Sequence, residues 1–235
     1  MVNSLACLDK KRNLASNDFQ QTLPIIDNNN LPLKLKEETK VDDLDKVRTL
    51  EELKDLIELD CYCSLKKTAK NMVFSDGNPQ ANIMFIGEAP GEFEDKIGLP
   101  FKGEAGKLLD KMLNAIELNR QNTYLSNIIF WRPPGNRKPT DEEIIACLPF
   151  VKKHIDLIKP KILVLLGATA ASAILNIQSG ITQIRGKWKN IETKNMKKIK
   201  SIPIFHPAFL LRQPSRKREA WEDLKKIKIE IDRYT

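Results

Sequence analysis

The chain has 235 residues, of which 41% are hydrophobic and 30% are charged. This composition is typical of one globular domain with, at most, an extension. No apolar run approaches the ~20 residues that span a bilayer, and the first residues lack the apolar core of a secretory signal. We therefore expect a cytoplasmic protein that has no membrane partner.

The charge of the chain is basic, because lysine and arginine outnumber aspartate and glutamate by 39 to 31. A basic surplus favours phosphate-rich partners such as nucleic acid, whose counterions lysine and arginine displace. A merely basic surface accounts for the same charge, so composition alone does not decide the partner.

The N-terminal segment, residues 1–45, is polar and shows no clear period. We interpret it as a loosely structured extension and place the functional domain at residues 46–235. Thr49 and Glu52 have the spacing of a capping box, which predicts a helix over about 49–59.

From residue 73 onward, short apolar runs alternate with segments of helical spacing, which predicts an α/β fold with a parallel sheet between two layers of helices. We expect strands at 83–86, 123–130, 161–166 and 202–205. We expect helices at 104–116, from 140 onward, at 168–175 and at 215–234. Sites in such sheets lie at the carboxyl ends of the strands, which selects the loops after Ile86, Ile129, Leu166 and Phe205.

The first of these loops combines glycine, proline and acidic residues. Its run Gly87, Glu88, Ala89, Pro90 and Gly91 predicts a tight turn whose backbone N–H groups can face a ligand. Carboxylates in the same segment, among them Glu94, can orient a water molecule or accept a proton. Exposed acids after a strand are also common without any function, so this loop alone is a weak signal.

Phe101 and Asn127 are candidates for binding a nucleobase. An aromatic ring between Pro100 and Gly103 can provide a stacking surface, although a buried loop anchor has the same sequence. Asparagine is a poor strand residue, and its amide both donates and accepts, as the N3–H and O4 edge of a pyrimidine requires. A local bond to the backbone is the alternative for Asn127.

The second and last loops add basic residues, a histidine and two leucines. Arg132 and Arg137 flank a Pro-Pro-Gly segment and can bind phosphate. His206 follows a strand and is a candidate hydrogen-bond donor at neutral pH, whereas we expect His154, inside a helix, to be an ordinary surface or packing residue. Leu210 and Leu211 can wedge into a base stack or can simply contact the final helix.

Five ordered segments resemble those of the family 4 uracil-DNA glycosylases, and together they cover about residues 61–230. They are VFSDGNP (73–79), GEAPGEFEDKIGLPFKGEAG (87–106), SNIIFWRPPGNRKPT (126–140), PKILVLLG (160–167) and HPAFLLR (206–212). The resemblance implies a three-layer αβα sandwich on a four-stranded parallel sheet. It also implies a DNA repair enzyme that hydrolyses the N-glycosidic bond of uracil and leaves an abasic site. We expect a monomer whose partner is uracil-containing DNA.

The resemblance also implies roles for the candidate residues. Phe101 would stack on the extruded uracil, Asn127 would bind its polar edge, and His206 would hydrogen-bond its O2 atom. Glu94 would handle the attacking water. The turn would line the pocket through Gly87, Glu88, Ala89, Pro90 and Gly91. On the DNA side, Leu210 or Leu211 would fill the gap left in the duplex, and Arg132, Arg137 and Arg212 would hold the backbone.

The cysteines depart from the pattern of the family, whose typical members bind a [4Fe–4S] cluster through four cysteines. Cys63 and Cys147 match the second and fourth ligand positions, Cys61 is displaced by one residue from the first, and Trp131 occupies the third. This incomplete set favours loss of the cluster, with Trp131 filling its space and Cys147 packed as a small hydrophobic residue. The alternative is an incomplete cluster assisted by Cys61. No cofactor is expected to be required for the chemistry.

Two other functions fit the same residues. One is a glycosylase with a different or broader preference, for hypoxanthine or mismatched thymine. The other is a uracil-DNA-binding protein without turnover. A related subfamily traps its product covalently through an inserted basic loop that ends in histidine. This chain runs from the first motif directly into KIGLPFKG without such an insert, which argues against trapping.

Overall fold

The structure is a computed structural model that describes residues 41–195 and 198–234. Residues 1–40, most of the predicted extension, lie outside the described residues, and helix α2 (Val41–Lys46) spans the predicted domain boundary. The predicted helix that follows is confirmed as α3 (Leu50–Asp60). Its capping box is formed, because Thr49 Oγ1 accepts from the backbone N–H of Glu52 at 3.1 Å and the Glu52 carboxylate accepts from the backbone N–H of Thr49.

Within the described residues, the sheet has six strands in the order β1-β3-β2-β4-β6-β5. They are β1 (Asp76–Gly77), β2 (Ile83–Gly87), β3 (Tyr124–Asn127), β4 (Ile162–Leu166), β5 (Lys189–Ile191) and β6 (Ile199–Ile204). The four central strands pair in parallel, as predicted, whereas β1 and β5 add antiparallel edges. The prediction of four strands is therefore incomplete, because the edge strands span only two and three residues and carry no readable period.

The longer helices agree with the predicted segments, and several short ones were not predicted. The helices after α3 are α4 (Glu92–Ile97), α5 (Glu104–Asn114), α6 (Asp141–Ile158), α7 (Ala168–Leu175), α8 (Ile181–Ile184), α9 (Pro207–Arg212) and α10 (Lys217–Ile231). The 3₁₀ helices are η1 (Ser64–Lys67), η2 (Pro134–Asn136) and η3 (Pro214–Arg216). None of the described helices has the length and apolarity needed to cross a membrane.

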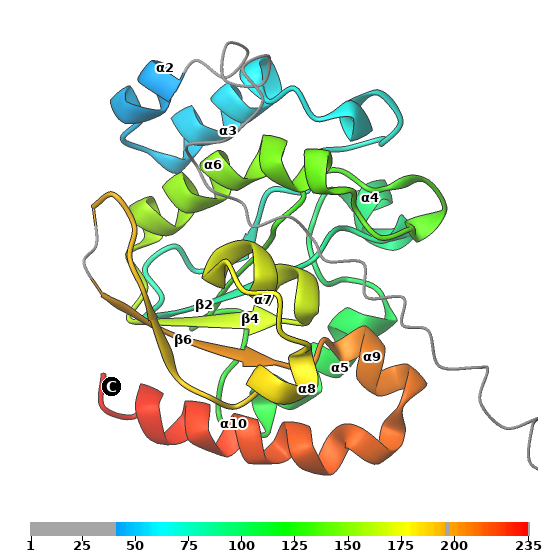
Figure 1. Ribbon diagram of the computed structural model, residues 1–235, viewed down its shortest axis with the longest axis vertical. Helices are drawn as coiled ribbons and strands as arrows, with labels where there is room; N and C mark the ends of the chain where they lie inside the picture. Colours follow the sequence, from blue (N-terminus) through cyan, green and yellow to red (C-terminus); the bar gives the residue numbers. More distant parts are fainter. Residues whose placement is uncertain (1–40, 196–197, 235) are drawn as a thin grey trace, which may run out of the picture.

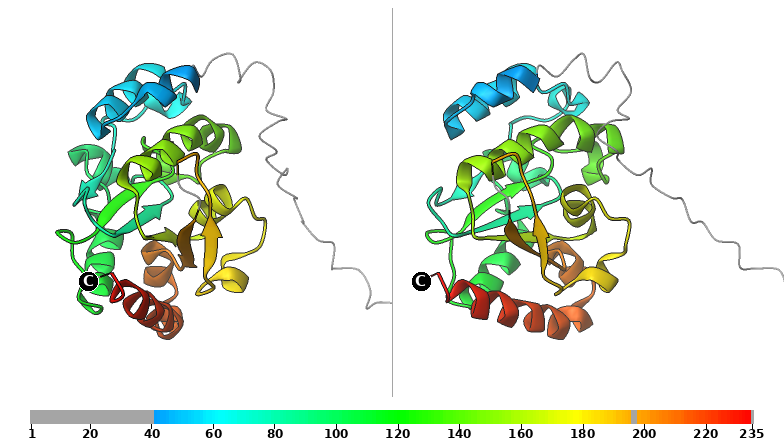
Figure 2. Two further views of the ribbon diagram at one scale, coloured as in Figure 1. Left: turned by 90° about the vertical axis from the view of Figure 1, so that its left-hand side faces the viewer. Right: turned by 60° about the vertical axis from the view of Figure 1, so that its left-hand side comes forward.

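The core lies in two parts, one on each face of the sheet. Successive strand side chains point to opposite faces, so Met84 and Ile86 pack with residues of α3, α6 and α7. Ile83 and Phe85 instead pack with residues of α5 and α10. Helices α6 and α10 lie on opposite sides of the strands (Figures 1 and 2). This arrangement confirms the three-layer αβα architecture, with β2 and β4 at the centre.

Helix α6 carries a buried histidine. His154 is fully buried, stacks on Phe74 at a ring distance of 4.3 Å and forms a 2.8 Å hydrogen bond with the hydroxyl of Tyr124. Burial lowers the pKa of His154 to about 3, so the ring is neutral. Of the two predictions for His154, packing is confirmed and a surface position is wrong.

Candidate active site

A cavity of about 500 Å³ opens at the carboxyl ends of the parallel strands, the position expected for a ligand site in an open α/β sheet. All four loops selected from the sequence contribute to it. The lining residues from those loops include Glu88, Asn127, Gly167 and His206. Other predicted residues in the lining are Ala89, Pro90, Gly91, Glu94, Phe101, Arg137 and Arg212.

Phe101 and His206 face each other in this cavity, with ring centroids 6.2 Å apart. Both Phe101 and Asn127 depend on Gly87 at the end of β2. A Cβ atom on Gly87 would lie 2.6 Å from Phe101 Cζ and 2.5 Å from Asn127 Oδ1, closer than van der Waals contact allows. The absence of a side chain at Gly87 therefore allows the Phe101 ring and the Asn127 amide to approach the same strand end.

Asn127 carries an unpaired acceptor at the cavity. The residue ends β3, beside Gly87 in the parallel register, and is only 1% exposed. Its Oδ1 atom has no hydrogen-bond partner among the described residues. Such a group costs about 1–3 kcal/mol when it is left unsatisfied, and a donor on a ligand removes that cost. The alternative of a local backbone bond is therefore not realised for Oδ1.

The chemical state of His206 is fixed by its neighbours. Its Nδ1 atom accepts a 3.1 Å hydrogen bond from the backbone N–H of Ala208 at the start of α9. The proton of the neutral ring must then sit on Nε2, which becomes a donor. Burial, with a smaller contribution from the charge of Arg212, lowers the pKa of His206 to about 4. His206 therefore offers a neutral donor at physiological pH.

Glu94 joins the first loop to the segment that carries Phe101. Its buried carboxylate accepts hydrogen bonds from the backbone N–H groups of Gly103 at 2.7 Å, Lys102 at 2.9 Å and Gly91 at 3.2 Å. These three bonds define a positioning role for Glu94. Its predicted role in handling water stays a prediction.

Glu88 is the less constrained of the two predicted acids. It lines the cavity and is partly exposed. One carboxylate oxygen accepts a hydrogen bond from the hydroxyl of Thr169, in the first turn of α7. Thr169 was not predicted from the sequence, because a threonine at the start of a helix has no distinctive pattern.

The arginines predicted to bind DNA are placed by other side chains. Arg137 forms a two-pronged ion pair with Glu143, with N–O distances of 2.6 and 2.9 Å. Arg132 donates to the side chain of Asn136 at 2.7 Å and lies 3.6 Å from a carboxylate oxygen of Glu92. These contacts orient the guanidinium groups, and phosphate binding by either residue stays a prediction.

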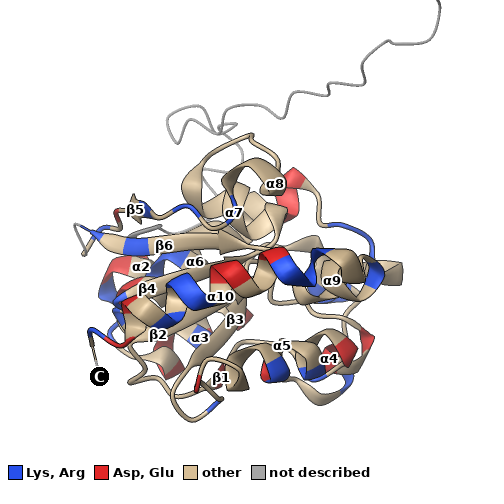
Figure 3. Cartoon of the chain, turned by 90° about the horizontal axis from the view of Figure 1, so that it is seen from below, with Lys and Arg blue, Asp and Glu red and all other residues tan. Residues whose placement is uncertain are grey.

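The two leucines of α9 differ sharply in exposure. Leu210 is 1% exposed and packs in the core with residues of α10, whereas Leu211 is 45% exposed. For Leu210 the alternative, contact with the final helix, is confirmed, and Leu211 is the exposed candidate for the wedge, which stays a prediction. Basic residues lie close to this leucine in the sequence, at Arg212 in α9 and at Lys217 and Arg218 at the start of α10, and they are coloured blue in Figure 3.

Several lining residues were missed. They are Ala105, Pro133, Asn136, Leu166, Gly167, Ala168, Ile181, Phe205, Ala208 and Phe209. The strand-end rule, which selected the loops after Leu166 and Phe205, was the signal for some of them. Ile181 comes from the helix α8, which has only four residues and no readable helical period.

The three described cysteines do not fit a [4Fe–4S] cluster. Cys61, Cys63 and Cys147 are buried and free, and the sulfurs of Cys61 and Cys147 are in direct contact at 3.9 Å. Hydrogen bonding with Cys147 lowers the pKa of the Cys63 thiol. Iron in such a cluster needs four thiolates around it, and none of the described His, Cys, Asp or Glu side chains form a group of three or more that could hold a metal ion.

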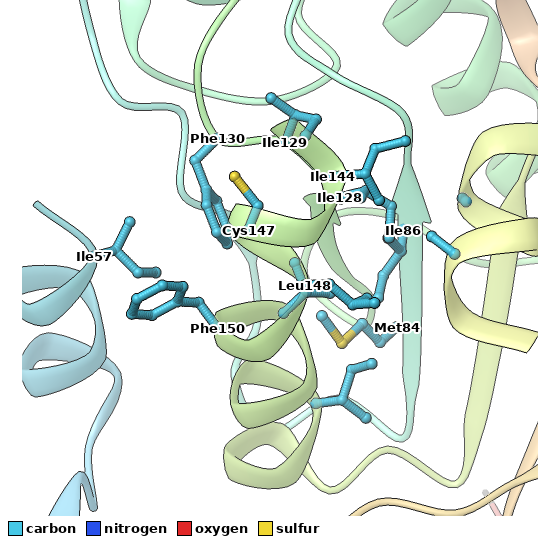
Figure 4. Packing of buried hydrophobic residues seen from close by; sticks show 14 of the residues in the cluster. Ile57, Met84, Ile86, Ile128, Ile129, Phe130, Ile144, Cys147, Leu148 and Phe150 are labelled. Carbon is cyan, nitrogen blue, oxygen red and sulfur yellow. The ribbon is translucent and has the colours of Figure 1, made fainter. Parts of the chain in front are cut away.

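Trp131 occupies the remaining ligand position and cannot bind iron. Its indole is 3% exposed and meets Phe130 edge to face at 6.2 Å. Cys147 lies beside Phe130 in the same apolar cluster (Figure 4). This region of the molecule is therefore packed as hydrophobic core.

The fold and the cavity together define an α/β protein whose cavity is lined by an aromatic ring, a buried amide and an imidazole. The family model "Uracil DNA glycosylase superfamily" matches residues 74–225. A type-4 uracil-DNA glycosylase of Sulfurisphaera tokodaii is 42% identical over 80% of this chain and 88% of its own length. One from Archaeoglobus fulgidus is 41% identical over 76% of this chain and 92% of its own length. One from Thermotoga maritima is 42% identical over 71% of this chain and 86% of its own length. The chain belongs to the uracil DNA glycosylase superfamily.

Proposed function

We propose that this protein is a DNA repair glycosylase that hydrolyses the bond between uracil and deoxyribose and leaves an abasic site. The observation that carries the proposal is the unpaired Oδ1 of Asn127, buried in a cavity that Phe101 and His206 also line. The names of the relatives, which match most of this chain, support the same activity.

Recognition begins with extrusion, because uracil inside a duplex is out of reach of any side chain. The extruded base stacks on Phe101. Its N3–H donates to Asn127 Oδ1 and its O4 accepts from the amide nitrogen of Asn127. Cytosine has an acceptor at N3 and a donor at position 4, so it leaves the buried amide mispaired and is rejected.

Cleavage moves the electrons of the C1′–N1 bond onto uracil, so negative charge develops on its O2 atom and positive charge on the sugar. The Nε2–H of His206 donates to O2 and stabilises the leaving anion, an effect of about 3–4 kcal/mol for a single well-placed donor. Water then adds to C1′, and the proton that it loses neutralises the uracil anion, so the products are the abasic sugar and free uracil.

Of the two acids, Glu88 is better suited to orient this water. Glu94 is held by three backbone N–H groups, whereas Glu88 has one hydrogen bond, from Thr169, and reaches the cavity. We therefore propose that Glu88 handles the water, in place of the role predicted for Glu94, whose carboxylate positions the loop. Loss of excision in Glu88→Gln, with uracil binding retained, is the expected result.

An excision assay tests the proposed function. Oligonucleotides with a single deoxyuridine, deoxyinosine or G·T mismatch are incubated with the protein, and base release is followed over several turnovers. We expect uracil to be released with turnover. Preferential release of hypoxanthine or thymine would establish the broader glycosylase instead, and binding without release would establish a non-catalytic protein.

We also propose that folding and activity need no iron–sulfur cluster. The support is the donor set, in which Trp131 replaces a thiolate and the sulfurs of Cys61 and Cys147 are in contact. Protein purified without exposure to air should contain no stoichiometric iron and should lack the absorbance at roughly 400 nm of such clusters. Four irons per chain would overturn this proposal, and zinc analysis of the same sample serves as a control.

A further inference from the structure

Arg120 lies outside the cavity, in the turn between α5 and β3, yet it contacts the backbone that carries Phe101. Its Nη1 donates to the carbonyl of Pro100 at 3.2 Å, and its Nη2 donates to the carbonyl of Phe101. The side chain is only 20% exposed. Arg120 therefore contacts the backbone of Phe101 without lining the cavity.

The backbone of Phe101 needs such support. Its φ angle is +54°, in the left-handed region that residues other than glycine occupy only at an energetic cost. Helix α5 packs against it at Gly106, where a Cβ atom would lie 1.8 Å from the Phe101 carbonyl oxygen. The conformation therefore persists because its surroundings fix it.

The peptide group between Phe101 and Lys102 is held at both ends. Its carbonyl accepts from Arg120, and its N–H donates to the carboxylate of Glu94 at 2.9 Å. One contact comes from the turn before β3 and the other from α4. Rotation of this peptide would break both charge-assisted hydrogen bonds. The two hydrogen bonds therefore fix the backbone of Phe101 and, with it, the orientation of its ring.

Arg120 is itself oriented by two carboxylates. Its Nε donates to Asp110 at 2.9 Å, and its Nη1 lies 2.5 Å from Asp76, which also pairs with Lys102 at 2.7 Å. Burial raises the pKa of Asp76, but hydrogen bonds from Lys102 and Arg120 outweigh it and hold the pKa below its usual value. The contacts use donors on all three nitrogens of a planar guanidinium, which the single ammonium of lysine cannot replace.

We propose that Arg120 is a positioning residue of the base-binding site, which holds the Phe101–Lys102 peptide from the side opposite Glu94 and so presents the ring to the extruded base. The inference rests on the proposed function, because it assigns Phe101 to base stacking. It adds a determinant of base binding that does not touch the base.

The test is a double-mutant cycle between Arg120→Met and Phe101→Ala, with Arg120→Lys as the conservative variant. The readouts are the single-turnover rate on deoxyuridine DNA and inhibition by free uracil. We expect Arg120→Met to weaken both by about ten- to a hundredfold, since a misplacement of roughly 1 Å can cost about 10²-fold. In the Phe101→Ala background the same change should have little further effect, because the ring it positions is absent.

Arg233→Met is the matched control, since Arg233 forms a 3.0 Å ion pair with Glu230 at the far end of α10. It should leave uracil inhibition unchanged. Fully additive losses in the cycle, or unchanged uracil inhibition in Arg120→Met, would overturn the proposal. If Arg120→Met does not fold, Asp76→Asn is used in the same cycle. Failure of the wild type to release uracil contradicts the proposed function instead. In that case, direct binding of free uracil to the wild type and the variants tests the coupling between Arg120 and Phe101 alone.

Discussion

At the scale of single residues, the protonation state of His206 gives the sharpest prediction. Its folded pKa of about 4 lies below the ordinary value of 6.5, so the ring is neutral above pH 5 and acts as a donor without being charged. Titration of His206 should therefore leave the excision rate unchanged around pH 6.5. The rate should fall only as the pH approaches 4. A single-turnover pH series on deoxyuridine DNA measures this.

A rate that rises as the pH falls from 7.5 to 6 would instead indicate catalysis by the charged imidazolium. His206→Ala should lower the rate by about 10²–10³-fold, as expected for removal of one preorganised donor. The fold should persist, because the hydrogen bond that the variant loses is a single one, from the backbone N–H of Ala208 to Nδ1 at the start of α9.

Asn127 and its neighbour Ser126 should show opposite effects when truncated. Asn127→Ala removes a buried acceptor that has no partner, so we expect the excision rate to fall by about 10²-fold while thermal stability changes little. Ser126→Ala, the matched control on β3, removes a 2.8 Å hydrogen bond to the Phe74 carbonyl. It should cost about 1 kcal/mol of stability and leave the rate unchanged. Near-wild-type excision by Asn127→Ala would contradict the assignment of the base-binding amide.

At the scale of elements, α9 separates two adjacent leucines by function. Leu210→Ala opens space in the core and should lower the free energy of unfolding by about 2–5 kcal/mol. Leu211→Ala removes an exposed side chain and should change stability by less than about 0.5 kcal/mol. It should reduce excision from duplex DNA more than from single-stranded DNA, because only a duplex has a gap to fill. Equal losses on both substrates would exclude a wedge.

The same helix shows why part of the fold was hidden in the sequence. Strands β2 and β4 are apolar runs, buried on both faces, and could be predicted. Helix α9 has only six residues, too few for a helical period to be read. Without that period, nothing distinguished Leu210 from Leu211, since it is the helical turn that points one inward and the other outward.

At the scale of the whole molecule, the site could be predicted because parallel strands end at one edge. Glu88 follows β2, Asn127 ends β3 and His206 comes after β6. These strands run parallel in one sheet, so a single rule brings the three residues together. Arg120 follows no such rule. Its partners are two backbone carbonyls and two carboxylates in other segments, and their approach depends on how α5 packs against the Phe101 loop.

The pH dependence of stability is a property of the whole fold to which His154 contributes. Its pKa is about 3 in the folded protein and about 6.5 when unfolded. The unfolded state therefore binds an extra proton below pH 6.5, and the stability contributed by neutral His154 is lost as the pH falls towards 3. His206 acts in the same direction, whereas Asp223, whose pKa is raised to about 6, acts in the opposite one.

Comparison with His154→Gln isolates this contribution, because the other groups are common to both proteins. Glutamine retains an acceptor for the Tyr124 hydroxyl but does not titrate. In urea unfolding at pH 7, 6 and 5, the free energy of unfolding should fall more steeply with falling pH in the wild type than in the variant. Below pH 6 the difference between the two slopes should correspond to about one bound proton. Parallel pH profiles would mean that His154 gains a proton in the folded state, which its stacking on Phe74 and its full burial oppose.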